Sequence, residues 1–305
     1  ISQLDNINAI SSMTEANNFE ASTQKISMGA GYYYVKATGE GNQAPWYLSH
    51  MIQPVKGQDK SEECLWAVKP TGKLNADFIW KFESCEEGYK MQCVNVGKYF
   101  QLKTATNNGD NNTYLTEDFK QGNKILLTDT GGESKFCIKN SSNHNIRTEN
   151  GDANGAQVNY WDGESNETWY LIPVNEIEID ITSAGWATMH LPFAVEVPNT
   201  LKAYAVTEVN ATSANLNEKT LIPANEGVLL EGEEGSYTLT ITTADAWNDN
   251  DNLLEGTNVT TELKGSAYIL SAPNGEVGLY LTALKDGVAK FQNKANKAYL
   301  PAGLV

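Results

Sequence analysis

The segments NGAQVNYW (residues 154–161) and NETWYL (166–171) complete the third of three similar units in the first half of the chain. The units begin GYYYVK (31–36), GYKMQC (88–93) and KFCIKN (135–140), and a polar turn and a second strand follow each start. They close at Trp80, Ile125 and Trp169, which are 45 and 44 residues apart. A unit of four short strands cannot bury its apolar face alone, so three units predict a closed threefold β architecture.

The charge balance excludes several classes of partner. The 305 residues include 22 Lys+Arg and 38 Asp+Glu, which gives a net charge of −16. A nucleic-acid-binding protein needs a basic face, and so does a protein that docks on anionic lipid. No apolar run approaches the roughly 20 residues that span a bilayer, so we expect no nucleic-acid partner and no membrane insertion.

The pattern of apolar, polar and turn-forming residues divides the chain into three parts and predicts an all-β protein. Residues 1–28 are polar, with apolar residues at helical spacing, and form an N-terminal arm or a short helix. Residues 29–175 contain the three units. In residues 176–305, Ile177, Ile179 and Ile181 alternate with polar residues, and further short β-type runs follow. Nine or ten strands without a long helix predict a β-sandwich there.

The third unit resembles the repeats of ricin B-type β-trefoil lectins. Those repeats carry N-G-x-x-(hydrophobic)-x-x-W and then an N-Q-x-W box. The resemblance implies a β-trefoil over residues 29–175, with Trp169 in the core. It also implies that Trp161 is the platform for a sugar ring and that Asn166 binds sugar hydroxyls. Glu167 stands where the family has Gln.

The other two units carry less of the lectin pattern. In the first of the three repeats the resemblance implies that Trp80 is the core residue and that Trp66 is a second sugar platform. The second repeat has neither tryptophan. The sugar-binding Asp of the family is absent from all three units. The matching places hold Ser49, Gln101 and, in the third unit, Ile146 or Arg147.

The last part of the chain resembles a second module. The runs GWATMHLPF (185–193), IPANEGVLL (222–230) and NKAYL (296–300) are similar to a β-sandwich module of secreted and surface proteins of gut anaerobic bacteria. This resemblance implies export to the cell surface or the extracellular space and a bacterial source.

Catalytic and metal-binding motifs are missing from the sequence. There is no H-E-x-x-H, no G-x-S-x-G and no phosphate-binding loop among the 305 residues. The four cysteines contain no C-x-x-C pair, so they are free thiols or form one or two disulfides. Acidic residues at 245–255 alternate with Asn, but the glycine of an EF-hand loop is missing, which favours a polar connection over a calcium site. We therefore expect no enzyme activity, no metal and no cofactor.

Two functional hypotheses remain. The first is a secreted or cell-surface, non-catalytic carbohydrate-binding protein whose partner is a glycan or glycoprotein. The second is an adhesin or protein-interaction module that binds other surface proteins and uses the trefoil only as a scaffold. If Trp161 is a core residue instead of a sugar platform, the second hypothesis is favoured.

Overall fold

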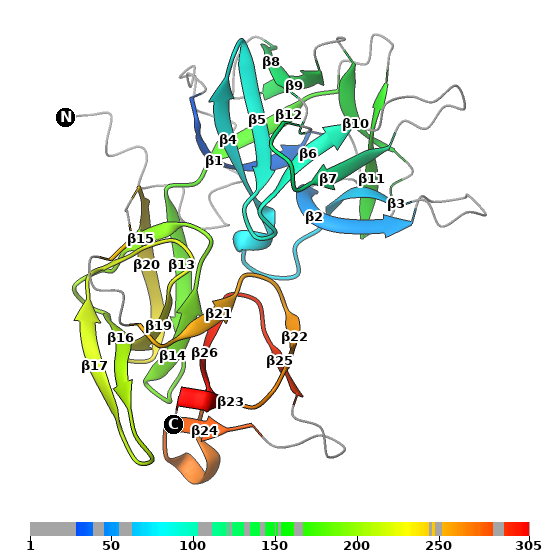
Figure 1. The fold of residues 1–305 in the computed structure, drawn as a ribbon. Coiled ribbons are helices and arrows are strands. Elements are labelled where there is room, and N and C mark those ends of the chain that lie inside the picture. Colours follow the sequence, from blue (N-terminus) through cyan, green and yellow to red (C-terminus); the bar gives the residue numbers. More distant parts are fainter. Residues whose placement is uncertain are drawn as a thin grey trace, which may run out of the picture. The chain divides into compact units, whose positions relative to one another are not determined.

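The computed structural model shows a chain made almost entirely of β-strands (Figure 1). The structure describes residues 29–38, 46–54, 63–102, 112–120, 122, 124–130, 135–140, 144–149, 151, 154–161, 167–243, 246–247, 252–282 and 290–304. The predicted N-terminal arm (1–28) and most of the acidic stretch at 245–251 lie outside the described residues. Among the described residues there is no helix whose length and apolarity would let it cross a membrane.

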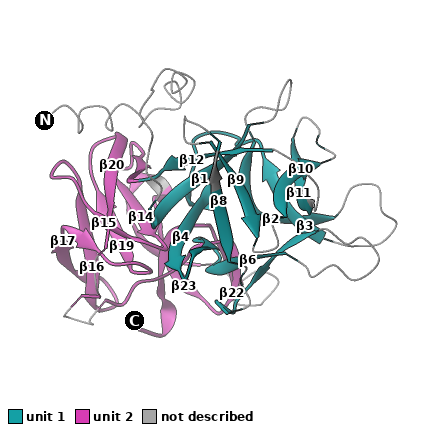
Figure 2. Cartoon of the chain, turned by 90° about the horizontal axis from the view of Figure 1, so that it is seen from above, with its two compact units in different colours: residues 1–174 teal, residues 175–305 magenta. Residues whose placement is uncertain are grey.

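Two compact units make up the chain, residues 1–174 and residues 175–305 (Figure 2). The change in sequence texture predicts a boundary near residue 175.

The described part of the second unit forms three four-stranded sheets and a two-stranded ribbon. The first sheet has the order β13 (Glu176–Ile181), β20 (Gly235–Thr242), β15 (Ala194–Glu196) and β18 (Leu221–Ile222). The second has the order β14 (Trp186–His190), β19 (Gly227–Glu231), β16 (Lys202–Val209) and β17 (Ala214–Lys219). The third has the order β21 (Glu255–Thr257), β26 (Lys297–Pro301), β23 (Ala267–Ser271) and β24 (Gly278–Leu281), and the ribbon pairs β22 (Thr261–Lys264) with β25 (Lys290–Asn293). These strands outnumber the nine or ten predicted, because runs of two or three residues such as β18 and β21 are too short to show a pattern.

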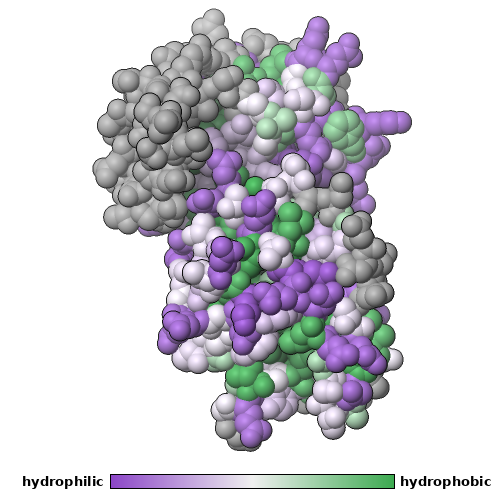
Figure 3. All heavy atoms as spheres, turned by 90° about the vertical axis from the view of Figure 1, so that its left-hand side faces the viewer, coloured by the Kyte–Doolittle hydropathy of each residue, from purple (hydrophilic) through white to green (hydrophobic). Residues whose placement is uncertain are grey.

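Apolar packing joins the second and third of these sheets. Val206 and Leu229 from the second sheet form one buried cluster with Leu254 and with Leu300 from the third. On the face shown in Figure 3, the remaining exposed apolar side chains form separate patches among polar ones. Among the described residues, the large apolar side chains that remain exposed are few enough to examine singly.

In its described residues the first unit (1–174) has twelve strands, four for each of the three sequence repeats. The first repeat has β1 (Gly31–Ala37), β2 (Tyr47–Pro54), β3 (Glu63–Val68) and β4 (Ile79–Cys85). The second has β5 (Gly88–Cys93), β6 (Lys98–Leu102), β7 (Thr113–Thr116) and β8 (Ile125–Asp129). The third has β9 (Lys135–Asn140), β10 (Asn145–Glu149), β11 (Gly155–Trp161) and β12 (Trp169–Pro173).

Six of these strands close a ring. Strand β1 pairs with β12 and β4, β5 pairs with β4 and β8, and β9 pairs with β8 and β12. The other six form three antiparallel hairpins, β2–β3, β6–β7 and β10–β11. Each repeat thus gives its first and last strands to a barrel and its middle two to a hairpin, which makes the first unit a trefoil-like fold.

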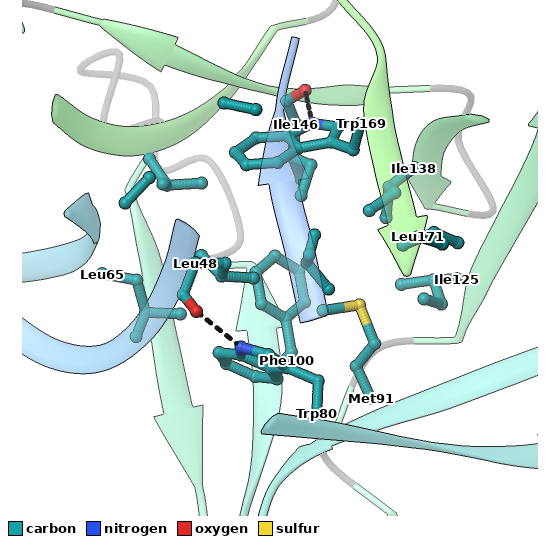
Figure 4. Packing of buried hydrophobic residues seen from close by; sticks show 14 of the residues in the cluster. Leu48, Leu65, Trp80, Met91, Phe100, Ile125, Ile138, Ile146, Trp169 and Leu171 are labelled. Atoms are coloured by element: carbon teal, nitrogen blue, oxygen red, sulfur yellow. Dashed lines mark hydrogen bonds between the residues drawn. The ribbon is translucent and has the colours of Figure 1, made fainter. Parts of the chain in front are cut away.

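Trp80 and Trp169 lie at the centre of this core and are completely buried. Each indole Nε1 donates a hydrogen bond to a backbone carbonyl of the second strand of its own repeat, at 3.0 Å to Leu48 and 3.1 Å to Ile146 (Figure 4). In the second repeat Ile125 takes the corresponding place and has no N–H to donate. A buried indole N–H is costly unless it is paired, so this hydrogen bond explains how tryptophan fits the core position.

The strand register shows which residues correspond between repeats. Trp169, Trp80 and Ile125 lie opposite Ala37, Cys93 and Asn140 respectively. The residues two positions earlier, Val35, Met91 and Ile138, are all fully buried. The four cysteines are free thiols, which is one of the two alternatives that the sequence left open, and Cys93 and Cys137 lie on the equivalent strands β5 and β9.

Candidate functional site

The hairpin of the third repeat has one apolar face and one polar face. Its strands pair Asn145 with Trp161, and Arg147 with Asn159. Because side chains alternate along a strand, Ile146, Val158 and Tyr160 lie on the other face, and they belong to the core cluster. The third-repeat polar cluster is defined here as Asn145, Arg147, Glu149, Asn159 and Glu167.

The members of this cluster hold one another in place. Arg147 Nη2 lies 3.3 Å from Glu149 Oε2, and the side-chain amide of Asn159 donates a hydrogen bond to the same carboxylate. Asn159 is buried, and its Oδ1 has no hydrogen-bond partner among the described residues. Charged and amide groups that are fixed in this way are suited to binding a polar ligand, because their side chains lose little freedom when the ligand binds.

Glu167 joins the hairpin to the strand that follows it. Its Oε1 accepts hydrogen bonds from the backbone N–H of Thr148 at 2.8 Å and from the Thr148 hydroxyl at 2.7 Å. Burial raises the pKa of the Glu167 carboxyl, against the hydrogen bonds from Thr148, which lower it. A glutamine side-chain carbonyl can accept the same two hydrogen bonds, so this position is compatible with either Glu or Gln.

The connection between β11 and β12 has both of its ends at Asn145. At one end Asn145 is the ladder partner of Trp161, and at the other its Nδ2 donates to the carbonyl oxygen of Glu167 at 2.8 Å. The Trp161 side chain and the whole of Asn166 lie outside the described residues. The described residues that border this connection, Trp161 by its backbone and Glu167, both contact Asn145 of the cluster.

Trp66 does not have the environment that a sugar platform needs. Tyr47 pairs with Val68 in the first repeat as Asn145 pairs with Trp161 in the third. Val68 is therefore the counterpart of Trp161, and Trp66 is the counterpart of Asn159. The Trp66 side chain is only 7% exposed and packs in a cluster with Tyr47, Cys64, Val68 and Phe78. A stacking platform needs an open ring face, so the structure does not support the assignment of Trp66 as a sugar-binding residue.

The first repeat carries a carboxylate where the third has Asn166. Asp77 precedes Trp80 by three residues, as Asn166 precedes Trp169. His50 Nε2 lies 3.1 Å from Asp77 Oδ1, and Asn95 Nδ2 also donates to this oxygen. The hydrogen bond from His50 is the largest cause of a lowered pKa at Asp77. The protein's own donors thus occupy Oδ1 of this carboxylate, as Arg147 and Asn159 occupy Oε2 of Glu149 in the third repeat.

The second repeat has an aromatic pair, exposed Phe119 and half-buried Tyr99, that the sequence motifs did not indicate. Phe119 is 43% exposed and contacts Tyr99 edge-to-face, with ring centroids 5.2 Å apart. Lys90 Nζ lies 5.5 Å from the Phe119 ring centroid, and the Tyr99 hydroxyl donates to Glu83 Oε2 at 3.0 Å. The lectin-like motif has tryptophan before the closing position, whereas a phenylalanine stands six residues before Ile125 in this repeat. An aromatic residue of any type in that loop is the sequence signal for the pair.

Within the described ranges, no group of three or more His, Cys, Asp or Glu side chains is placed to hold a metal ion. The features that remain as candidates for ligand binding in the first unit are the third-repeat polar cluster and the Tyr99–Phe119 pair.

No protein-family model and no curated protein matches the chain. The solved structures that are similar include ricin B-like lectins, which match about half of the chain. A Macrolepiota procera ricin B-like lectin in complex with lactose is 16% identical over 50% of this chain and 100% of its own, with a TM-score of 0.36. The Rhizoctonia solani agglutinin is 18% identical over 50% of this chain and 100% of its own, with a TM-score of 0.36. The Polyporus squamosus lectin bound to a human-type influenza-binding epitope is 16% identical over 51% of this chain and 52% of its own, again with a TM-score of 0.36.

Proposed function

We propose that this chain is a secreted or cell-surface, non-catalytic carbohydrate-binding protein and that its sugar site lies on the third repeat. The observation that carries the proposal is the position of Asn145, which meets both ends of the connection that bears Trp161 and Asn166. The trefoil-like strand pairing and the lectin-like motif at 154–171 support the same function.

In this proposal the Trp161 ring stacks on the C–H face of a pyranose. Asn166 and the polar cluster bind the sugar hydroxyls, with Arg147 as a donor and Glu149 as an acceptor. Shallow single sites of this kind bind near millimolar, which is about −4 kcal/mol. Useful retention on a glycan then comes from several sites or from a tethered partner domain.

The second unit is proposed to be a β-sandwich module like those of secreted and surface proteins of gut anaerobic bacteria. The runs at 185–193, 222–230 and 296–300 support this part of the proposal, and with it the export of the chain. Its own activity is not part of the carbohydrate-binding proposal.

A second candidate function is an adhesin or protein-interaction module. The first repeat favours it, because Trp66 is buried in an apolar cluster with Phe78 and offers no open ring face to a sugar. The absence of the family's Asp from Ser49, Gln101 and Arg147, which the register shows to be equivalent, favours it too.

A glycan array of plant, mucin and bacterial glycans separates the two functions. The purified chain and its Trp161→Ala variant are applied to the same array at equal concentration. Carbohydrate binding by the third repeat predicts a defined set of glycans bound by the wild type and lost from the variant. No bound glycan for the wild type, with the fold shown intact by circular dichroism, would contradict the proposal and favour the protein-interaction function.

A further inference from the structure

A hydrophobic cavity opens in the second unit, and every described residue that lines it belongs to that unit. Its volume is about 370 Å³, and it lies between the β16–β17 hairpin and the β23–β24 hairpin. Its walls are mainly aromatic and aliphatic, and they include Trp186, Leu216, Tyr268, Leu270, Val277 and Leu279. Cavities of this size with apolar walls are typical of sites for small molecules.

The cavity has a buried floor and an apolar mouth. Leu229 and Leu300 form the floor, and both are buried in the cluster that joins two sheets. At the mouth Leu216 is 41% exposed and Val277 is 38% exposed. Two large apolar side chains are thus left in contact with water at one opening, and a bound apolar group would remove them from water.

Contacts within the protein fix the walls before any ligand arrives. The Trp186 ring stacks on Tyr204, with centroids 6.0 Å apart and planes 27° apart, and the Tyr204 hydroxyl donates to Glu231 at 2.7 Å. The turn between β16 and β17 is held by Asn210, whose Oδ1 accepts hydrogen bonds from the backbone N–H groups of Thr212 and Ser213, both at 3.0 Å. A preformed site loses little conformational entropy on binding.

The charges around the cavity define its ligand. No lysine, arginine or histidine is among the described residues that line it, and the polar groups at its edge come from the turn at Asn210, Thr212 and Ser213. Residues 175–305 contain seven lysines and seventeen acidic residues. A carboxylate or phosphate would find no cation there and would be repelled by the unit as a whole.

We propose that this cavity binds an uncharged hydrophobic small molecule that carries one hydrogen-bonding group at its end, as a medium-chain alcohol does. The apolar part lies between Trp186, Tyr268 and Leu279, and the hydrogen-bonding group meets the turn at residues 210–213. This site is independent of carbohydrate binding by the first unit.

The test uses the full chain and the uncharged fluorescent probe N-phenyl-1-naphthylamine. Two matched variants each place a carboxylate on an exposed apolar position of the second unit. Leu216→Glu changes the mouth of the cavity. Ile269→Glu changes the opposite face of β23, between the cavity residues Tyr268 and Leu270.

We expect the wild type to bind the probe, Leu216→Glu to weaken binding about tenfold or more, and Ile269→Glu to change it less than about twofold. Decanol should displace the probe at lower concentration than decanoate does. Absence of probe binding, equal effects of the two variants, or displacement by decanoate as good as by decanol would each overturn the proposal. Light scattering measures the oligomeric state of the wild type and of Leu216→Glu. A wild-type dimer that becomes a monomer in Leu216→Glu would overturn the proposal, because a second copy of the chain would then occupy the cavity.

Discussion

The two buried tryptophans of the first unit combine apolar packing with a directed hydrogen bond. Trp80 and Trp169 each satisfy their indole N–H on a carbonyl of the hairpin in the same repeat. The closing strand and the hairpin of a repeat are therefore joined by one side chain. Removal of that side chain leaves both a cavity and a carbonyl without its partner.

Trp169→Ala is expected to destabilise the first unit by about 3–5 kcal/mol, because it removes a completely buried aromatic side chain. Trp161→Ala is expected to cost less than about 1 kcal/mol if Trp161 is an exposed platform, as for surface changes in general. Urea unfolding followed by circular dichroism measures both. Equal losses for the two variants would place Trp161 in the core and would favour the scaffold hypothesis.

Trp66→Phe is expected to change stability by less than about 1 kcal/mol. The Trp66 Nε1 is buried without a hydrogen-bond partner in the described part of the chain, so replacement by phenylalanine removes an unpaired polar group along with some packing. Thermal unfolding measures the effect. A large loss of stability would show that the indole N–H has a partner outside the described residues.

His190 makes the second unit sensitive to acid. The side chain is buried, its Nδ1 lies 2.8 Å from Asn258 Oδ1, and burial lowers its pKa below the ordinary value of 6.5. Below pH 6.5 the unfolded chain therefore binds a proton that the folded chain resists, so the stability is fully present above pH 6.5 and falls as the pH drops through the folded pKa.

A series of melting temperatures from pH 8 to pH 5 tests this effect. The wild type should lose stability below about pH 6.5, and His190→Gln should flatten the decline, because glutamine does not titrate. A decline of the same slope in the variant would show that His190 does not cause the acid sensitivity.

At the scale of elements, strands were easier to predict than their register. The aromatic residues in the first strand of each repeat and the tryptophans that close two of the repeats predicted units of four strands. Burial in the barrel requires apolar residues at these positions. The pairing of Trp66 was not visible, because 14 residues separate it from Trp80 while eight separate Trp161 from Trp169. The polar cluster was missed for the same reason: Arg147 and Asn159 meet only across a hairpin whose register the sequence does not show.

One glycine tests the contact between the hairpins of the first and third repeats. A Cβ added at Gly155 would lie 2.4 Å from the carbonyl oxygen of Ala67, so β11 and β3 would have to move apart. Gly155→Ala is therefore expected to cost about 1–3 kcal/mol, as overpacking commonly does. Gly29→Ala is the control, because nothing lies within 4 Å of its added Cβ. Thermal unfolding compares the two, and equal small effects would contradict this pairing of the hairpins.

At the scale of the whole molecule, the spacing of the three repeats predicted the threefold arrangement of strands in the first unit. The change in residue pattern near residue 175 predicted where that unit ends. A closed ring of six strands follows from three units that cannot be stable alone. The second unit was less predictable. Its alternating Ile177, Ile179 and Ile181 indicated a half-buried strand, and Ile177 and Ile181 are buried. The third sheet was not predicted separately, because several of its strands are short and partly polar.

Each unit is expected to fold alone when the chain is cut between Val174 and Asn175. The units have separate sheets and separate buried clusters, so each fragment keeps its own core. Near-UV circular dichroism of the two purified fragments measures this, and their summed spectra should reproduce that of the full chain. An unfolded fragment 1–174 would show that the trefoil-like unit depends on the rest of the chain.

The central claim is that the third repeat binds a sugar and the first repeat does not. Isothermal titration of one array-selected glycan into the wild type, Trp161→Ala and Trp66→Phe tests it most directly. The account predicts no measurable binding to Trp161→Ala, unchanged affinity for Trp66→Phe, and folded protein in all three samples. Unchanged affinity for Trp161→Ala together with loss of binding in Trp66→Phe would contradict it.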